Sequence, residues 1–207
     1  MRQKYPNSLI IQFAKSPQLG QVKTRMQARL SKKQSLALHC NLVKQTWHTL
    51  CASKLCDIEL CVSEGDDAFF KALIPPPKLT SQHGYDLGQR MHNAIEAGLQ
   101  NYQSVLLVGS DCPSIDEAYL FRALKALEEK PVVVGPAEDG GYVLIGMKYI
   151  QPKIFEHVSW GTSQVLAQTR QSLVQEKCKW TELPTLADID RPVDLSHIKN
   201  LAEMLTL

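Results

Sequence analysis

The sequence predicts an α/β protein in which a mostly parallel, doubly wound sheet is flanked by helices. Short apolar runs alternate along the chain with longer segments in which apolar residues recur every three or four positions. The run 105–108 is apolar at four consecutive positions, which suits a strand buried on both faces. No repeat or Pro/Gly-rich linker divides the 207 residues. We therefore expect residues 1–207 to form a single domain.

Seven segments have the composition of strands, and helical segments separate most of them. The expected strands are 8–14, 57–63, 78–82, 105–108, 132–135, 142–147 and 179–183. The expected helices are one from 22 or 23 to a break at Ser31, one from there to Ser53, and 66–73, 86–100, 115–129 and 162–175. A last helix should hold Pro192 in its first turn. A Gly-rich turn should join 132–135 to 142–147.

The composition excludes several classes of protein. Hydrophobic residues make up 44% of the chain and charged residues 21%, as in soluble globular proteins. We expect no membrane span, because the apolar runs are too short to cross a bilayer. We expect a cytoplasmic protein, because the first residues have no apolar signal core. The six cysteines form no CxxC pair, so they predict free thiols and neither a zinc site nor a disulfide framework.

Charge is distributed very unevenly along the sequence. Residues 1–56 contain ten Lys or Arg and no Asp or Glu, whereas the remainder contains 13 basic and 21 acidic residues. This gives +10 for the first part and −8 for the second. We infer that the N-terminal part supplies cations for a phosphate-bearing ligand and that later segments supply carboxylates. A nucleic-acid partner is not expected, since no nucleic-acid-binding motif is present.

Asp111 follows the apolar run in SVLLVGSDCP. Ligands of open parallel sheets bind outside the carboxyl ends of the strands, where this carboxylate would lie. Its ordinary explanation is capping of the next helix. Ser114, with Glu117 three residues later, already matches a capping box. Asp111 is therefore a candidate metal or substrate ligand.

The segment FAKSPQLGQVKTRM (13–26) predicts a phosphate-binding loop between a strand and a helix. Gly20 permits a close backbone approach, and Lys15, Lys23 and Arg25 supply positive charge. The N-terminus of a helix carries partial positive charge, so cations are unfavourable there. A bound anion would compensate both charges, which favours a phosphate-binding role for this loop. A solvated basic helix start is the alternative. The spacing matches neither a Walker loop nor a GxGxxG fingerprint.

Two later segments supply further carboxylates. In PAEDGGY (136–142), the glycines allow a tight turn that could place Glu138 or Asp139 beside a ligand, although an Asp-Gly hairpin turn is a strong ordinary explanation. In ADIDRPVD (187–194), helix capping is the ordinary role of the aspartates. Alternatively, Asp188 or Asp190 joins Asp111 around Mg²⁺ or Mn²⁺, with ligand phosphates completing the coordination.

Five segments occur in an order that resembles the DUF2064 family. They are FAKSPQLGQVKTRM, QHGYDLGQRM, GSDCP, GPAEDGGYVLIG and DIDRPVDL. Members are often described as glycosyltransferase-like proteins associated with radical SAM and arsenosugar genes. The resemblance implies a single-domain GT-A-like (Rossmann-like) fold, shared with phospholactate guanylyltransferase and other nucleotide-diphospho-sugar transferase relatives.

The resemblance also implies roles for particular residues. Lys15, Gly20, Lys23 and Arg25 match the nucleotide-phosphate loop, and Arg90 of QHGYDLGQRM is a further phosphate-binding candidate. Asp111 matches the metal-binding aspartate and Asp190 the late aspartate. Two features depart from the pattern: the DxD pair is reduced to Asp111-Cys112-Pro113, and Arg191 replaces a common Thr.

These residues predict a Mg²⁺- or Mn²⁺-dependent transferase that uses a nucleotide or nucleotide-sugar and a small-molecule acceptor. Lys23 and Arg25 would hold the diphosphate, the Asp111 metal would stabilise the leaving group, and Asp139 would orient or deprotonate the acceptor. One alternative is a nucleotidyltransferase that releases pyrophosphate. Another is a catalytically degenerate nucleotide-binding module. Tyr142 and Trp160 could stack on a substrate ring, although core packing is their ordinary role.

Overall fold

The computed structural model describes residues 3–65 and 68–206, which build one seven-stranded sheet. The strand order is β3-β2-β1-β4-β6-β5-β7. The strands are β1 (Ser8–Ala14), β2 (Asp57–Val62), β3 (Leu79–Ser81), β4 (Ser104–Gly109), β5 (Val132–Pro136), β6 (Tyr142–Met147) and β7 (Trp180–Glu182). β6 runs antiparallel to β4 and β5, and the other pairings are parallel. The predicted mostly parallel α/β fold is confirmed.

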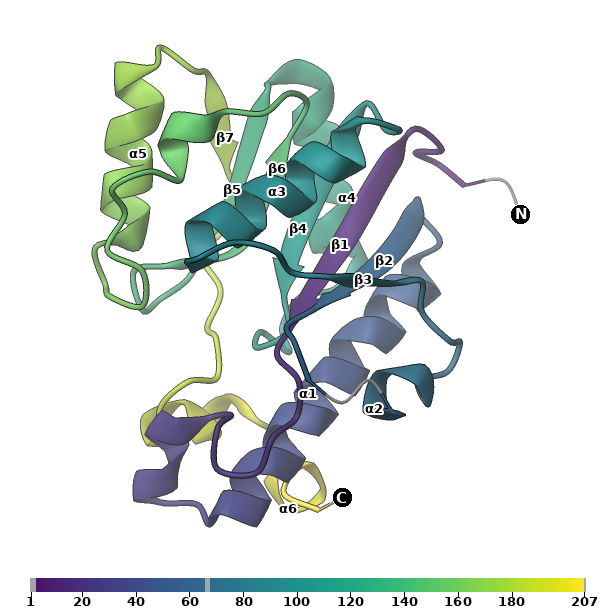
Figure 1. The fold of residues 1–207 in the computed structure, drawn as a ribbon, viewed down its shortest axis with the longest axis vertical. Helices are drawn as coiled ribbons and strands as arrows, with labels where there is room; N and C mark the ends of the chain where they lie inside the picture. Colours follow the sequence, from purple (N-terminus) through teal and green to yellow (C-terminus); the bar gives the residue numbers. More distant parts are fainter. Residues whose placement is uncertain (1–2, 66–67, 207) are drawn as a thin grey trace.

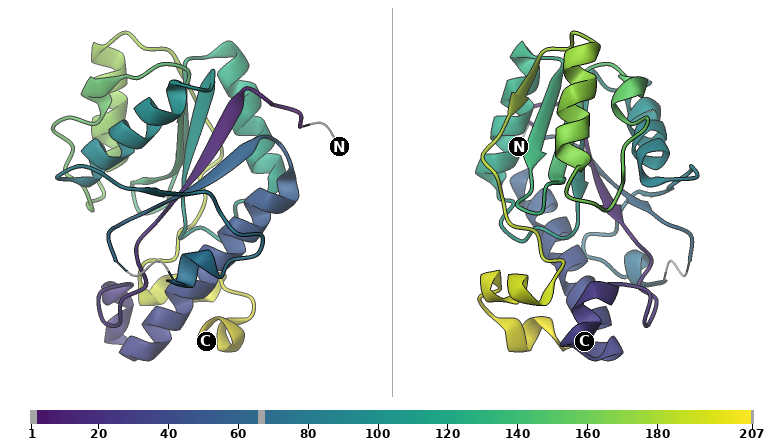
Figure 2. Two further views of the ribbon diagram at one scale, coloured as in Figure 1. Left: turned by 45° about the vertical axis from the view of Figure 1, so that its right-hand side comes forward. Right: turned by 90° about the vertical axis from the view of Figure 1, so that its left-hand side faces the viewer.

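Helices cover both faces of this sheet (Figures 1 and 2). They are α1 (Lys32–Ser53), α2 (Ala68–Lys71), α3 (Leu87–Leu99), α4 (Glu117–Glu129), α5 (Val165–Gln175) and α6 (Leu201–Met204). Three short 3₁₀ helices are η1 (Thr24–Ala28), η2 (Pro152–Ile154) and η3 (Pro192–His197). Among the described residues, no helix is both long and apolar enough to cross a membrane.

The burial of β1 on both faces shows why the central strands are mostly apolar. Leu9 and Ile11 belong to the core that α3 and α5 cover, whereas Ile10 packs with the core under α4. Every residue of β1 is buried. Because both faces are covered, β1 is mostly apolar instead of alternating, and its polar residues Ser8 and Gln12 are buried with hydrogen-bond partners.

Local predictions were wrong at two helix starts. The N-cap of α4 is Asp116, whose side chain accepts a hydrogen bond from the Tyr119 backbone N–H at 2.7 Å, so the expected Ser114 cap is not used. The expected helix from residue 22 or 23 is the 3₁₀ helix η1, which Lys23 enters in the left-handed conformation with φ 48°. A left-handed residue interrupts regular helical geometry, which shortens the element.

The other differences concern bounds. Helix 66–73 is observed as α2, and its first two expected residues lie outside the described part of the chain. Helix 162–175 begins at Val165. The tail forms η3, with Pro192 in its first turn as expected, and then α6. Gly140 and Gly141 lie in the β5–β6 connection, as predicted for the Gly-rich turn.

Below the carboxyl ends of β1 and β4, segments from the two ends of the chain meet. η1 packs against η3, and α6 packs against α1 (Figures 1 and 2). Met26, Leu38 and Ile189 form a small apolar core there, together with Leu30, Leu42 and Leu195. This second core places the N-terminal loop and the C-terminal tail against the end of the sheet.

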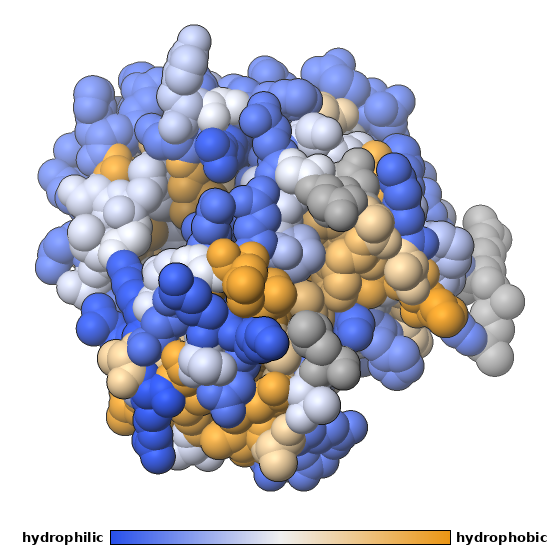
Figure 3. Space-filling model, turned by 60° about the horizontal axis from the view of Figure 1, so that its bottom comes forward, coloured by the Kyte–Doolittle hydropathy of each residue, from blue (hydrophilic) through white to orange (hydrophobic). Residues whose placement is uncertain are grey.

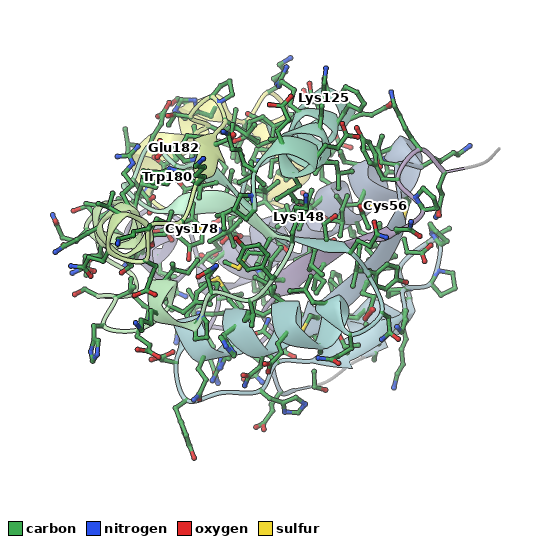
Figure 4. The ribbon with its side chains drawn as sticks, turned by 90° about the horizontal axis from the view of Figure 1, so that it is seen from above. Cys56, Lys125, Lys148, Cys178, Trp180 and Glu182 are labelled. Carbon is green, nitrogen blue, oxygen red and sulfur yellow. The ribbon has the colours of Figure 1, made fainter. Side chains whose placement is uncertain are left out.

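At the far edge of the sheet, polar contacts hold the short strand β7. Glu182 accepts hydrogen bonds from Arg170 Nε at 2.8 Å and from Trp180 Nε1 at 2.9 Å. Figure 4, seen from above, shows Trp180 and Glu182 together at this edge. The contacts tie β7 to α5, and the segment that follows β7 leads to the tail.

Gly146 in β6 supplies a stability test of this packing. A Cβ there would lie 2.3 Å from Leu106 Cδ2 and 2.9 Å from Val133 Cγ1, both of which are buried. Gly146→Ala should therefore lower the free energy of unfolding by about 1–3 kcal/mol, measured by urea denaturation. Gly109→Ala in β4 is the control, since its Cβ would meet one atom, Val143 O, at 3.7 Å. Equal stability of the two variants would contradict the packing described.

Candidate functional site

A cavity of about 610 Å³ opens at the carboxyl ends of β1 and β4. Its lining includes seven of the eight residues predicted for the site: Lys15, Lys23, Arg25, Arg90, Asp111, Asp139 and Asp190. Figure 3 shows the molecule with its bottom turned forward, where hydrophilic residues surround several hydrophobic patches. The fold thus brings together segments as distant in sequence as the first loop and the tail.

Gly20 is the predicted residue that does not line the cavity. It lies in the turn before η1 with φ +79°, a backbone conformation that residues other than glycine rarely adopt. A Cβ there would lie 3.4 Å from Lys32 Cδ. Gly20 therefore shapes the first loop through its backbone.

Asp111 directly follows the turn that ends β4, and a buried network fixes this turn. Gln12 Nε2 donates to Ser110 Oγ at 2.9 Å, and Ser110 Oγ donates to Phe13 O at 2.8 Å. Gln12 is fully buried in the centre of β1. A buried side-chain amide needs such partners, because an unpaired polar group in the core is costly. The network joins the ends of β1 and β4 immediately before Asp111.

Lys23 joins the first loop to both β4 and the tail. Its side chain is 3% exposed, and its ammonium contacts Asp111 Oδ1 at 2.8 Å and donates to Ile189 O. Burial would raise the pKa of Asp111, but the charge and hydrogen bond of Lys23 outweigh it and hold that pKa below its usual value. Because the Asp111 side chain remains 48% exposed, it can still meet a ligand in the cavity.

Arg25 binds two other segments at the rim. Its Nη1 contacts Asp190 Oδ2, and its Nη2 donates to Gly161 O at 3.0 Å. The hydrogen bond and charge of Asp190 raise the pKa of Arg25. Arg25 and Asp190, both predicted as ligand contacts, therefore neutralise each other. Asp194 accepts hydrogen bonds from the backbone N–H groups of Asp190 and Arg191, which is the capping role expected there.

Asp188, like Asp139, forms no ion pair among the described residues, whereas Asp111 and Asp190 each do. Burial is the main cause that raises its pKa to about 6, and the charges of Asp139, Asp111 and Asp190 raise it further. Between Asp188 and Asp190, Ile189 is fully buried in the small lower core, and its N–H donates to Asp111 O at 2.8 Å. The sequence showed Asp188 and Asp190 as equivalent choices, and the ion pair with Arg25 distinguishes them.

The donor set fits a hard divalent cation only in part. Asp111 and Asp188 offer carboxylate oxygens, which Mg²⁺ and Mn²⁺ prefer. Within residues 3–65 and 68–206, no three His, Cys, Asp or Glu side chains form a group that could hold a metal by themselves. A cation there would need further oxygens from a bound phosphate, as Mg²⁺ commonly does.

Two of the four predicted phosphate-binding cations form no ion pair in the described part of the chain, although the charge of Lys15 contributes to the lowered pKa of Asp111. Lys15 is exposed at the end of β1, and Arg90 is half-buried in the first turn of α3. The carbonyl of Lys15 lies 2.9 Å from Nε2 of His39, a cavity-lining residue of α1 that sequence reasoning missed. Desolvation lowers the pKa of His39. A neutral imidazole can donate this hydrogen bond and fix the loop.

The β5–β6 turn places Asp139 at the cavity. Its Oδ1 accepts a hydrogen bond from the Gly141 N–H at 2.7 Å, and its side chain is exposed. Asp139 therefore stabilises its own turn, the ordinary role considered for it, and also lines the cavity. Tyr142 and Trp160 contact each other edge to face with ring centroids 6.4 Å apart, and both line the same cavity.

The fold and the cavity at the strand ends define a nucleotidyl- or sugar-transferase-like α/β protein. A "putative nucleotide-diphospho-sugar transferase" from Desulfovibrio desulfuricans G20 is 30% identical, with a TM-score of 0.86, over 94% of this chain and 88% of that one. The model of the family "Uncharacterized protein conserved in bacteria (DUF2064)" matches residues 46–162. The chain belongs to the DUF2064 family, as its motifs predicted.

More distant structures share the fold. The 4-diphosphocytidyl-2C-methyl-D-erythritol synthase of Anaerococcus prevotii is 12% identical, with a TM-score of 0.60, over 93% of this chain and 96% of that one. The inositol-1-phosphate CTP transferase of T. maritima is 16% identical, with a TM-score of 0.59, over 98% and 96%. No curated protein matches the sequence.

Removing the Asp188 charge should stabilise the protein above pH 6. Asp188 holds its proton more tightly in the folded than in the unfolded protein, and this difference stabilises the fold. The contribution is fully present below pH 3.8 and is lost as the pH rises through about 6. Asp188→Asn removes this loss. After allowance for solvent screening, we expect the free energy of unfolding to rise by about 1 kcal/mol at neutral pH, or the Tm by roughly 2–4 °C. At low pH we expect no gain.

Thermal unfolding across this pH range measures the difference between Asp188→Asn and the unmodified protein. Glu138→Gln, which neutralises an exposed residue of the same turn as Asp139, is the control and should show no such dependence. If Asp188→Asn were less stable than the unmodified protein at neutral pH, the Asp188 carboxylate would not be destabilised by burial and by neighbouring negative charges.

Proposed function

We propose that this protein is a divalent-cation-dependent transferase that acts on a nucleotide-activated donor, with a nucleotide-sugar as the leading candidate. The observation that carries the proposal is the cavity that brings Lys15, which forms no ion pair among the described residues, together with the carboxylates Asp111 and Asp188. Cations and carboxylates at the carboxyl ends of parallel strands suit a ligand with phosphates and a metal. The similarity to the D. desulfuricans protein supports the same class of reaction.

The ion pairs change which residues we expect to contact the donor phosphates. Lys23 and Arg25 hold the site together through Asp111 and Asp190, so their charge is largely neutralised. Lys15 is free to contact the donor phosphates, and His39 fixes the backbone beside it. Lys23 and Arg25 are thus positioning residues in this proposal.

Asp111 and Asp188 would hold Mg²⁺ or Mn²⁺ together with donor phosphate oxygens. When bound, the cation supplies positive charge for the departing phosphate. Asp139 has one oxygen in its turn and an exposed carboxylate at the cavity, so it would accept a proton from, or orient, the acceptor hydroxyl. These roles need no further carboxylate from Asp190.

Metal-dependent nucleotide binding is the direct test. Mn²⁺ together with a nucleoside diphosphate should raise the Tm, because a ligand that binds only the native state stabilises it. Asp188→Asn should strongly reduce the part of the shift that depends on Mn²⁺, since a charged carboxylate ligand is replaced by a neutral amide. Asp116→Asn, an N-cap away from the cavity lining, is the matched control. An unchanged Mn²⁺ effect in Asp188→Asn would remove this residue from the metal site.

Lys15→Gln should weaken binding of the nucleoside diphosphate about tenfold, which corresponds to roughly 1.4 kcal/mol for one charged phosphate contact. Titration calorimetry measures the dissociation constant. Lys33→Gln, an exposed lysine of α1 outside the cavity, should leave it unchanged. Equal losses in the two variants would indicate general charge attraction and contradict a specific contact.

The leaving group identifies the reaction. With nucleotide-sugars, sugar transfer releases a nucleoside diphosphate, whereas a nucleotidyltransferase acting on nucleoside triphosphates releases pyrophosphate. Incubation with each donor type and a panel of hydroxylated and phosphorylated acceptors separates the two. Nucleotide binding without turnover of either donor would favour the degenerate binding module.

A further inference from the structure

We propose that the second substrate is an organic anion with an apolar body, held by Arg90 and by an adjacent apolar wall of the cavity. We call this the acceptor subsite; it consists of Leu87, Arg90, Met91, Tyr142 and Trp160. Its assignment to the acceptor rests on the proposed function. The ligand chemistry follows from the side chains alone.

Arg90 is held in place without being neutralised. Its Nε donates to Gly84 O at 3.0 Å, which fixes the stem of the side chain. Gly84 has φ +143°, and a Cβ there would lie 2.8 Å from Arg90 N, so glycine is required for this close contact. In the described part of the chain, Arg90 contacts no carboxylate. It therefore differs from Lys23 and Arg25, whose charges are paired.

A wall of apolar and aromatic side chains continues from Arg90. Met91 is buried, and Leu87 is 44% exposed at the start of α3. Trp160 packs so closely on α3 that a Cβ at Gly88 would lie 2.6 Å from its Cζ2. Beside these residues, Tyr85 is 98% exposed. Exposed apolar side chains next to a cavity are typical of ligand-binding surfaces.

The combination selects a particular ligand chemistry. The Arg90 guanidinium can bind a phosphate or carboxylate through two parallel hydrogen bonds. The neighbouring wall favours an aliphatic or aromatic body. A bare inorganic anion would use only Arg90, and a neutral apolar molecule only the wall. An organic phosphate or carboxylate uses both.

The acceptor subsite is on a different element from Lys15. Arg90 is in the first turn of α3, which begins beside the segment leading to α5 (Figure 1), whereas Lys15 follows β1. Trp160, from that segment, contacts Gly88 of the same turn. Two unneutralised cations on separate elements of one cavity suit two anionic substrates.

Phenyl phosphate is the probe, with inorganic phosphate for comparison. Titration calorimetry should show tighter binding of phenyl phosphate. Arg90→Gln should weaken it about tenfold, and Lys15→Gln less than twofold. Leu87→Ser, at a partly exposed position that folding should tolerate, should weaken phenyl phosphate severalfold and leave inorganic phosphate unchanged. The Tm of each unliganded variant checks that it is folded.

Three results would overturn the inference. They are equal affinity for phenyl and inorganic phosphate, a larger loss in Lys15→Gln than in Arg90→Gln, or displacement of phenyl phosphate by UDP in competition. The proposed function fails separately, if nucleoside diphosphates and Mn²⁺ give no stabilisation. The ratios among the phenyl phosphate affinities remain interpretable in that case.

Discussion

The ammonium of Lys23 is the contact on which the whole site depends. It is nearly inaccessible to solvent and joins the first loop to Asp111 after β4 and to Ile189 in the tail. Burying a charge is costly unless opposite charge and hydrogen bonds compensate it. Here one carboxylate and one carbonyl from distant segments do so. The loop, the strand end and the tail therefore form one unit, and the cavity exists only when all three are assembled.

Within this unit, the basic first part of the sequence forms ion pairs with the acidic later part. Two cations of the acid-free first part meet aspartates of the later part, Lys23 with Asp111 and Arg25 with Asp190. Such pairs are better regarded as a framework than as a phosphate site, because their charge is already satisfied. The charge available to a ligand belongs to Lys15, at the proposed donor position, and to Arg90, at the proposed acceptor position.

Asp188 shows the reverse imbalance. Its pKa is raised to about 6 because it is partly buried near other carboxylates, a state that lowers stability. Strain of this kind is common where a ligand supplies the missing partner. The second apolar core, centred on Met26 and Ile189, supports it by fixing the tail against the sheet. Apolar packing that does not itself line the cavity thus maintains an unfavourable arrangement of charge within it.

The sequence by itself determined the alternation of strands and helices, the buried central strands and the position of Asp111 at a strand end, because these depend on local periodicity and on the turn after β4. It also indicated the first loop and the family. Only the tertiary structure decided that Asp116 caps α4, that Arg25 engages Asp190 and leaves Asp188 unpaired, and that His39 and the α3 wall belong to the cavity. These features depend on tertiary contacts, such as those of His39 with Lys15 and of Arg25 with Asp190, or on competition between neighbouring side chains. Spacing along the chain cannot determine which charge finds a partner, whereas packing brings those charges together and thereby identifies the groups that remain free to bind.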